Sequence, residues 1–232
     1  MSRPRIVLLG DSITVGCRET GVTVETTYPS YLQKQLGRLG LNVDLVVSAL
    51  HGVYMDYAVR RFERMVGRHK PDFVLVMLGA NDAVPAGGNA STTPEDFQAA
   101  LERLVKLCTL ENATAIVASP PPRSDTRSSF LLKSYAETAR AIATEFELPF
   151  IDLFTRLHEE RFLNELLPDC QHPNPVANRI IADLVLECLL GLSDIRRCTP
   201  ATIADLPTSQ AAEITAPTTN DACSQARATG PP

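Results

Sequence analysis

Short apolar runs alternate with longer amphipathic segments along most of the chain. The runs are apolar at consecutive positions, which is typical of strands covered on both faces, and they span residues 5–10, 43–48, 72–78, 113–119 and 149–153. Helical patterns lie between them, near residues 28–39, 55–69, 94–110, 128–147 and 175–190. This alternation implies parallel strands joined by right-handed crossovers. We therefore predict an α/β protein, a three-layer α/β/α sandwich with a central parallel sheet of about five strands.

The pattern changes after residue 193. The remaining residues are rich in Thr, Ala, Pro and Ser, contain no aromatic side chain and show no sustained apolar period. Such a composition cannot bury enough apolar surface to fold. We expect one domain over residues 1–193 and a disordered tail over residues 194–232.

Composition and charge narrow the class of protein. The 232 residues are 44% hydrophobic, which suits one core. A net charge of -5 without a Lys/Arg cluster argues against nucleic acid as a partner. The N-terminal apolar run is too short for a signal peptide or a membrane span, so we expect no membrane insertion and a cytoplasmic location.

The six cysteines are scattered singly, which favours a reducing compartment over a disulfide framework. No two of them show the spacing of a zinc site, so we expect no structural metal. The sequence indicates nothing about the oligomeric state.

A serine follows the first apolar run, in the stretch GDSITVG at residues 10–16. In an open parallel sheet, ligands bind at the carboxyl ends of the strands, beside the point where strand order reverses, and the first strand normally flanks that point. Ser12 is therefore a candidate nucleophile. Two other interpretations stay open at this point: a cap for the following helix, or a hydroxyl in a phosphate or flavin site.

A serine nucleophile needs a base within hydrogen-bond reach and a group that orients the base. Among the four histidines, only His172 has a carboxylate, Asp169, three residues before it in a loop bounded by prolines. His69 and His158 fall in helical patterns, and His51 follows the second strand without a carboxylate close by. We take His172 as the candidate base and Asp169 as its orienter; the alternative is a surface loop in which Asp169 caps a helix.

Two further strand ends offer donors for an oxyanion. Gly52 follows the second strand, and its lack of a Cβ lets its backbone N–H approach a ligand closely. Asn81 follows the third strand and can offer a side-chain amide, although Asn-Asp is also an ordinary turn sequence.

Together these stretches resemble the SGNH (GDSL) hydrolase family, which is known by Ser, Gly, Asn and His in four ordered blocks. GDSITVG with Ser12 matches the first block, LGANDAVP with Asn81 the third, and PDCQHPNPVANRI with Asp169 and His172 the last. The pattern is most similar to small intracellular esterases related to isoamyl acetate-hydrolysing esterase. It covers residues 5 to about 190.

The chain departs from the family pattern at two places. Ser48-Ala49-Leu50 stand where the second block usually carries an Asn before its Gly, and Cys170 stands where many members have a Gly.

The resemblance implies a hydrolase of carboxylic esters that works through an acyl-enzyme. Ser12 would be the nucleophile, His172 the general base and Asp169 the group that orients the base. The oxyanion would be held by the backbone N–H groups of Ser12 and Gly52 and by the side-chain amide of Asn81. No metal or organic cofactor is required.

The expected substrate is a small ester. The loops at 83–93 and 120–130 are rich in small residues, which favours an open site and a short-chain, acetyl-type acyl group over a long-chain lipid. Two other hypotheses stay open. The same residues could serve a thioesterase or lysophospholipase, and a non-catalytic, flavodoxin-like binding module would leave Ser12 and His172 unrelated in space.

Overall fold

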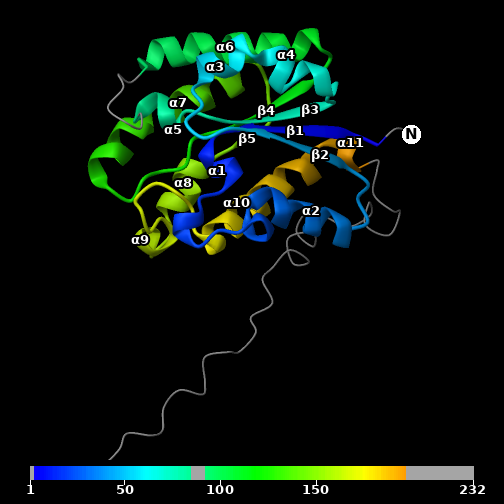
Figure 1. Cartoon of the computed structure of the whole chain (residues 1–232). Coiled ribbons are helices and arrows are strands. Elements are labelled where there is room, and N and C mark those ends of the chain that lie inside the picture. The colour runs from blue at the N-terminus through cyan, green and yellow to red at the C-terminus, as the bar shows by residue number, and fades with distance from the viewer. Residues whose placement is uncertain (1–2, 85–91, 197–232) are drawn as a thin grey trace, which may run out of the picture.

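A five-stranded parallel sheet forms the centre of the molecule (Figure 1). The computed structural model describes residues 3–84 and 92–196. The strand order is β2-β1-β3-β4-β5. The strands are β1 (Arg5–Gly10), β2 (Asp44–Ala49), β3 (Phe73–Met77), β4 (Thr114–Ala118) and β5 (Phe150–Ile151). The predicted α/β sandwich with about five parallel strands is confirmed.

The first strand lies inside the sheet, between β2 and β3. Ile6 pairs with Leu45 on one side and with Phe73 on the other. The chain runs from β1 to β2 and then crosses back over β1 to reach β3, so the strand order reverses beside the carboxyl end of β1. This is the place at which open α/β sheets bind their ligands.

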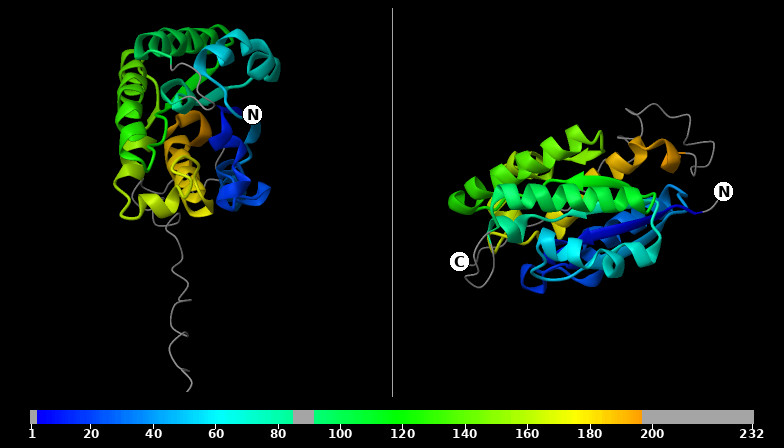
Figure 2. Two further views of the ribbon diagram at one scale, coloured as in Figure 1. Left: turned by 60° about the vertical axis from the view of Figure 1, so that its left-hand side comes forward. Right: turned by 90° about the horizontal axis from the view of Figure 1, so that it is seen from above.

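Helices cover both faces of the sheet (Figures 1 and 2). On one face α2 (Tyr28–Arg38) packs against α10 (Pro175–Gly191), and on the other α6 (Pro94–Leu110) packs against α3 (Met55–Arg60) and α7 (Thr126–Glu145). The shorter helices are α1 (Ser12–Val15), α4 (Phe62–Met65), α5 (Ala80–Ala83), α8 (Leu153–His158), α9 (Leu163–Leu166) and α11 (Ser193–Arg196), with 3-10 turns η1 (Arg18–Thr20), η2 (Val24–Thr26) and η3 (Gly67–His69).

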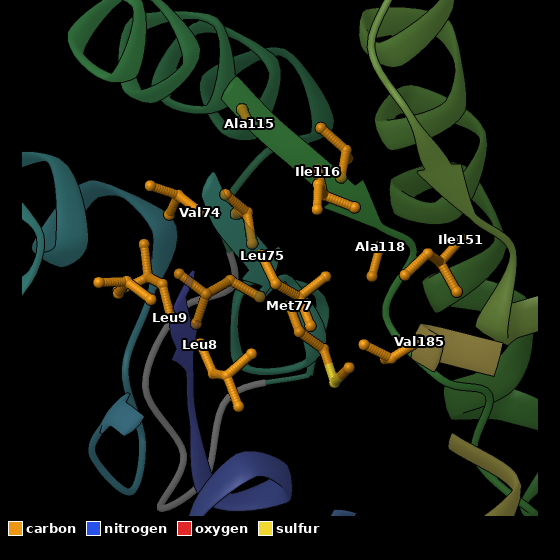
Figure 3. Close-up of a cluster of buried hydrophobic side chains, with 14 of the residues drawn as sticks. Leu8, Leu9, Val74, Leu75, Met77, Ala115, Ile116, Ala118, Ile151 and Val185 are labelled. Atoms are coloured by element: carbon orange, nitrogen blue, oxygen red, sulfur yellow. The ribbon is translucent and has the colours of Figure 1, made fainter. Parts of the chain in front are cut away.

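The core lies between the sheet and these two helix layers. Figure 3 shows Leu8, Leu75, Ile116 and Ile151 from four neighbouring strands gathered with Val185 of α10. All five side chains are buried. Burial of each such side chain stabilises the fold by about 1.5–3 kcal/mol, so the strand runs that reveal the fold in the sequence also hold it together.

The long helices begin where a polar side chain can accept a hydrogen bond from the first turn. Thr93 accepts from the backbone N–H of Asp96 at 3.1 Å, and Asn174 accepts from that of Ala177 at 2.9 Å. A proline follows each cap at the first helical position, where its missing N–H costs nothing.

The structure differs from the sequence-based expectation in two elements. The predicted helix at 55–69 is broken into α3, α4 and η3, because Arg61 and Val66 adopt non-helical backbone angles. Strand β2 is only partly buried, with Val47 52% exposed, because it forms an edge of the sheet.

The predicted boundary at residue 193 falls at the start of α11, in which Ile195 is fully buried. Residues 197–232, most of the predicted tail, lie outside the described part of the chain. None of the described helices has the length and apolar character needed to cross a membrane.

Candidate active site

Ser12 is the first residue of α1 and follows the carboxyl end of β1. The preceding Asp11 caps this helix, since its Oδ1 accepts a hydrogen bond from the backbone N–H of Ile13 at 2.9 Å. Ser12 is 5% exposed, so little of its surface faces solvent. At the first position of a helix its backbone N–H has no intrahelical partner and remains free for a ligand.

The loop between α9 and α10 brings His172 to the serine. Ser12 Oγ lies 3.0 Å from His172 Nε2, and His172 Nδ1 lies 2.6 Å from Asp169 Oδ2. The other carboxylate oxygen of Asp169 accepts from the backbone N–H groups of His172, at 2.6 Å, and Gln171, at 3.0 Å. This arrangement can support proton transfer from the serine to the imidazole. It differs from the binding-module hypothesis, which leaves Ser12 and His172 unrelated in space.

The electrostatics of Asp169 suit the orientation of an imidazole. Its partial burial alone would raise its pKa, but the hydrogen bonds from His172 and Gln171 outweigh this and hold the pKa below its ordinary value. A charged carboxylate at this position favours the tautomer of His172 that carries its proton on Nδ1, and in that tautomer Nε2 can accept a hydrogen bond from Ser12.

Several contacts fix the position of the histidine loop. The Cys170 carbonyl accepts from the backbone N–H of Ser124, at the start of the segment before α7, at 3.2 Å. The Pro173 carbonyl accepts from the Asn178 side-chain amide at 3.0 Å. Asn178 is 1% exposed, and its Oδ1 accepts from the backbone N–H of Tyr28 at 2.9 Å. One buried amide therefore joins the histidine loop to the start of α2.

Asn81 lies in α5, after β3 and at the same edge of the sheet as Ser12. Its side-chain amide donates to Asp11 Oδ2 at 3.2 Å and to the Val53 carbonyl at 3.1 Å. Asn81 is 2% exposed. It thus ties together the ends of β1, β2 and β3, and both of its amide hydrogens have partners within the protein.

Two buried carboxyl groups that were not predicted from the sequence support this arrangement. Asp11 is 1% and Asp82 0% exposed. Asp82 accepts from the backbone N–H of Met55 at 3.1 and 3.2 Å, which fixes the loop after β2. Burial raises the pKa of Asp11 to about 6 and that of Asp82 to about 7. Asp11 directly follows β1, and Asp82 follows β3 after a four-residue interval, so the available signal was an acidic residue close to each buried strand end.

Gly52 lies in the exposed turn after β2, with a φ of 71°. This φ lies in the left-handed region of backbone conformation, which favours glycine over residues that carry a Cβ. The Gly52 backbone N–H donates no hydrogen bond to any of the described residues. The group is therefore available to a ligand at the end of the sheet where Ser12 lies.

None of the other histidines is hydrogen-bonded to Ser12 or Asp169 among the described residues. The His69 carbonyl accepts from Arg5, at the amino end of β1, opposite to Ser12. His158 ends α8 and stacks on Phe154 with the ring centroids 6.0 Å apart. His51 is exposed beside Gly52.

The two loops expected to rim the site are described in part. Residues 85–91 of the first loop lie outside the described residues. In the second loop Arg123 is partly buried, and its Nη2 donates to the Val84 carbonyl at 3.2 Å. Its Nε is buried without a partner among the described residues. Desolvation lowers the pKa of Arg123, and nearby Asp125 and Asp169 oppose that effect.

Comparison with known proteins identifies the family. Residues 8–180 match the model of the GDSL-like lipase/acylhydrolase family. An arylesterase of Vibrio mimicus is 24% identical over 189 residues, which cover 80% of this chain and 88% of that protein. A thioesterase 1/protease 1/lysophospholipase L1 of Escherichia coli is 26% identical over 193 residues, covering 81% of this chain and 84% of that protein.

Solved structures share the fold. A lipase/acylhydrolase from Enterococcus faecalis superimposes with a TM-score of 0.72 at 24% identity, over 81% of this chain and 96% of that one. A catalytic mutant of an acetylxylan esterase from Geobacillus stearothermophilus gives a TM-score of 0.69 at 21% identity, over 81% and 94% of the two chains. Because the family match spans most of the chain, the chain belongs to the GDSL-like lipase/acylhydrolase family and is a hydrolase of carboxylic esters.

Proposed function

We propose that this chain is a serine esterase that hydrolyses short-chain, acetyl-type carboxylic esters through an acyl-enzyme. The observation that carries the proposal is the continuous hydrogen-bonded series from Ser12 through His172 to Asp169, with separations of 3.0 and 2.6 Å. A serine hydroxyl is a weak nucleophile until a base accepts its proton. These distances allow that transfer without rearrangement of the loop.

In the first half-reaction Ser12 Oγ attacks the ester carbonyl carbon while its proton passes to His172 Nε2. The imidazolium is stabilised by the Asp169 carboxylate, which does not itself take the proton. His172 then donates the proton to the departing alcohol. In the second half-reaction His172 takes a proton from water, and the resulting attack on the acyl-enzyme releases the acid and restores Ser12.

The tetrahedral oxyanion would be held by the backbone N–H groups of Ser12 and Gly52 and by Asn81. Asn81 already donates to Asp11 and to the Val53 carbonyl, so it must share or redirect one hydrogen when the oxyanion forms. The negative charge that develops on the substrate is a stronger acceptor than a neutral carbonyl. We therefore expect the hydrogen facing Val53 to be the one that turns to the substrate.

The acyl preference rests on the composition of the stretches at residues 83–93 and 120–130, which are rich in small residues. The arylesterase relative supports an oxygen ester as the substrate class. The Escherichia coli relative carries the words thioesterase and lysophospholipase, so acyl-thioesters and lysophospholipids are the second candidate substrates. The proposed chemistry is the same for both, since each presents an acyl carbonyl to Ser12. The cytoplasmic location stays a prediction from the sequence.

The direct test is hydrolysis of p-nitrophenyl esters over a range of acyl lengths, with Ser12→Ala measured in parallel. Ser48→Ala is a matched control, because Ser48 lies on β2 at the same end of the sheet, paired in register with Leu9. We expect the highest kcat/KM with acetyl and butyryl esters, loss of turnover in Ser12→Ala and retention in Ser48→Ala. Full activity in Ser12→Ala would refute the assignment.

An acyl-coenzyme A panel and a lysophospholipid panel separate the two substrate classes. A higher kcat/KM for long acyl-thioesters than for every oxygen ester would favour the second candidate. Labelling by a fluorophosphonate probe, which needs only an activated serine, reports the nucleophile independently of the substrate.

A further inference from the structure

Three side chains that could bind a metal, two of them members of the proposed triad, meet at the candidate active site. Cys17 Sγ, a carboxylate oxygen of Asp169 and a ring nitrogen of His172 all lie within 4.8 Å of one another. In residues 3–84 and 92–196 no second group of three such donors is found at this spacing. We propose that Cys17, Asp169 and His172 bind a zinc ion and that the bound ion inhibits the enzyme.

The fold holds Cys17 at this position although it is far from His172 in the sequence. Cys17 lies between α1 and η1, in the segment that follows the nucleophile. The hydroxyl of Thr20 lies 2.9 Å from the Cys17 carbonyl and 3.2 Å from the Pro173 carbonyl, next to His172. Thr20 is 7% exposed. A single buried hydroxyl therefore fastens the backbone of the thiol segment to that of the histidine loop.

The donor set matches the preferences of zinc. Thiolate sulfur binds Zn²⁺ at about 2.3 Å and imidazole nitrogen or carboxylate oxygen at about 2.0–2.2 Å, so donors in a tetrahedral site stand about 3.3–3.8 Å apart. The three donor atoms lie within 4.8 Å of one another, so they must move closer together by at most about one ångström. Small changes of side-chain rotamer can supply this movement. If the ligand atoms are Asp169 Oδ2 and His172 Nδ1, which now lie 2.6 Å apart, these two atoms would have to separate. Water completes the fourth position.

An ion can reach the thiol from solvent. Cys17 is partly buried and lines an open hollow of about 440 Å³ together with Glu19 and His51. The Glu19 carboxylate accepts a hydrogen bond from the Cys17 thiol at 3.1 Å. The carboxylates of Glu19 and Asp169 therefore both favour a divalent cation at this place. On binding, the thiol proton is released to solvent and the sulfur forms its bond to zinc as thiolate.

Inhibition follows from the ligands themselves and rests on the proposed function. If zinc takes Nε2 of His172, the lone pair that would accept the Ser12 proton is occupied. If zinc takes Nδ1, the hydrogen bond to Asp169 is lost and the imidazole has no orienter. Either mode removes the general base without any change to Ser12, and a chelator should restore it.

Metal binding is tested first without catalysis, in Ser12→Ala protein titrated with Cd²⁺, a spectroscopic substitute for zinc. A cadmium–thiolate bond adds charge-transfer absorption in the ultraviolet. We expect this absorption to saturate at one equivalent of Cd²⁺ per chain. It should be absent from the double variants that combine Ser12→Ala with Cys17→Ser or Cys17→Ala. Cys170→Ser is the matched control, because Cys170 is the next residue after Asp169 but is not part of the three-donor group. Two Cys17 variants guard against a folding defect in one of them.

Inhibition is then measured as ester hydrolysis by otherwise unchanged enzyme against Zn²⁺, with a phosphine reductant and a chelator rescue. The zinc concentration for half inhibition should rise at least about tenfold in Cys17→Ser and stay unchanged in Cys170→Ser, the kind of loss expected when a metal site is weakened. Equal sensitivity of Cys17→Ser and wild type would overturn the proposal, as would cadmium absorption that survives in both Cys17 variants. Cadmium binding that depends on Cys17, in an enzyme that hydrolyses no ester, would instead refute the proposed function and leave the metal site standing.

Discussion

Replacing Asp82 with asparagine should change how the stability of the protein depends on pH. Asp82 is fully buried, and its carboxylate accepts from the backbone N–H of Met55. Burial raises its pKa to about 7 from an ordinary value of 3.8. Between these two pH values the folded protein binds a proton that the unfolded chain releases. Its free energy of unfolding must therefore fall as the pH rises through this window.

The size of the effect follows from the pKa. Each pH unit within the window contributes about 1.36 kcal/mol, and two units lie between pH 5 and a folded-state pKa of about 7. Titration of Asp82 should thus lower the free energy of unfolding by about 3 kcal/mol between pH 5 and pH 8. The group is buried, so screening by solvent is small. An asparagine keeps an oxygen that can accept from Met55 but cannot titrate.

The assay is urea unfolding followed by circular dichroism at pH 5 and pH 8, for wild type and Asp82→Asn. Any constant cost of the substitution cancels when the difference between the two proteins is compared across pH. Asp56→Asn, an exposed carboxylate on α3, controls for the exchange of side-chain type. A wild-type-minus-variant difference that is equal at both pH values, or larger at pH 8, would show that the Asp82 carboxyl is not protonated in the folded state at pH 5.

Two predictions concern the oxyanion donors. Asn81→Ala should lower kcat by about a hundredfold to a thousandfold with little change in KM, as measured by steady-state ester hydrolysis. A change in KM alone would show that Asn81 does not stabilise the transition state. Gly52→Ala adds a Cβ that meets no atom within 4 Å but forces an alanine to a φ of 71°, which should cost about 1–2 kcal/mol in urea unfolding. If the Gly52 backbone N–H holds the oxyanion, kcat of the folded Gly52→Ala protein should also fall. An unchanged kcat would exclude Gly52 as an oxyanion donor.

Much of the fold could be predicted because its inner strands are continuous apolar runs that are easily recognised in the sequence. A strand inside a doubly covered parallel sheet must be apolar at every position, as β3 is, and no loop in this chain imitates such a run. The short helices α1, α5 and α9 were not predicted, because they have four residues each and show no helical period. The break at Val66 depends on packing that a periodicity cannot reveal.

The candidate site shows the same division. Asp169 and His172 are three residues apart, so a local pattern suffices to pair them. The approach of Ser12 to His172 spans 160 residues and was inferred only through strand order and the family resemblance. The contact between Asn81 and Asp11, and the position of Cys17 beside His172, have no local pattern at all, because they arise where separate loops meet above the sheet.

The buried amide of Asn178 has a consequence for the order in which the molecule becomes an enzyme. Ser12 stands near the beginning of the chain and its proposed base, His172, lies 160 residues later. Asn178 on α10 joins the histidine loop to α2. A nascent or truncated chain that stops before α10 can contain Ser12, Asp169 and His172, but it lacks Asn178, which joins the histidine loop to α2. We therefore expect the proposed triad to be held in place only once α10 has packed against α2.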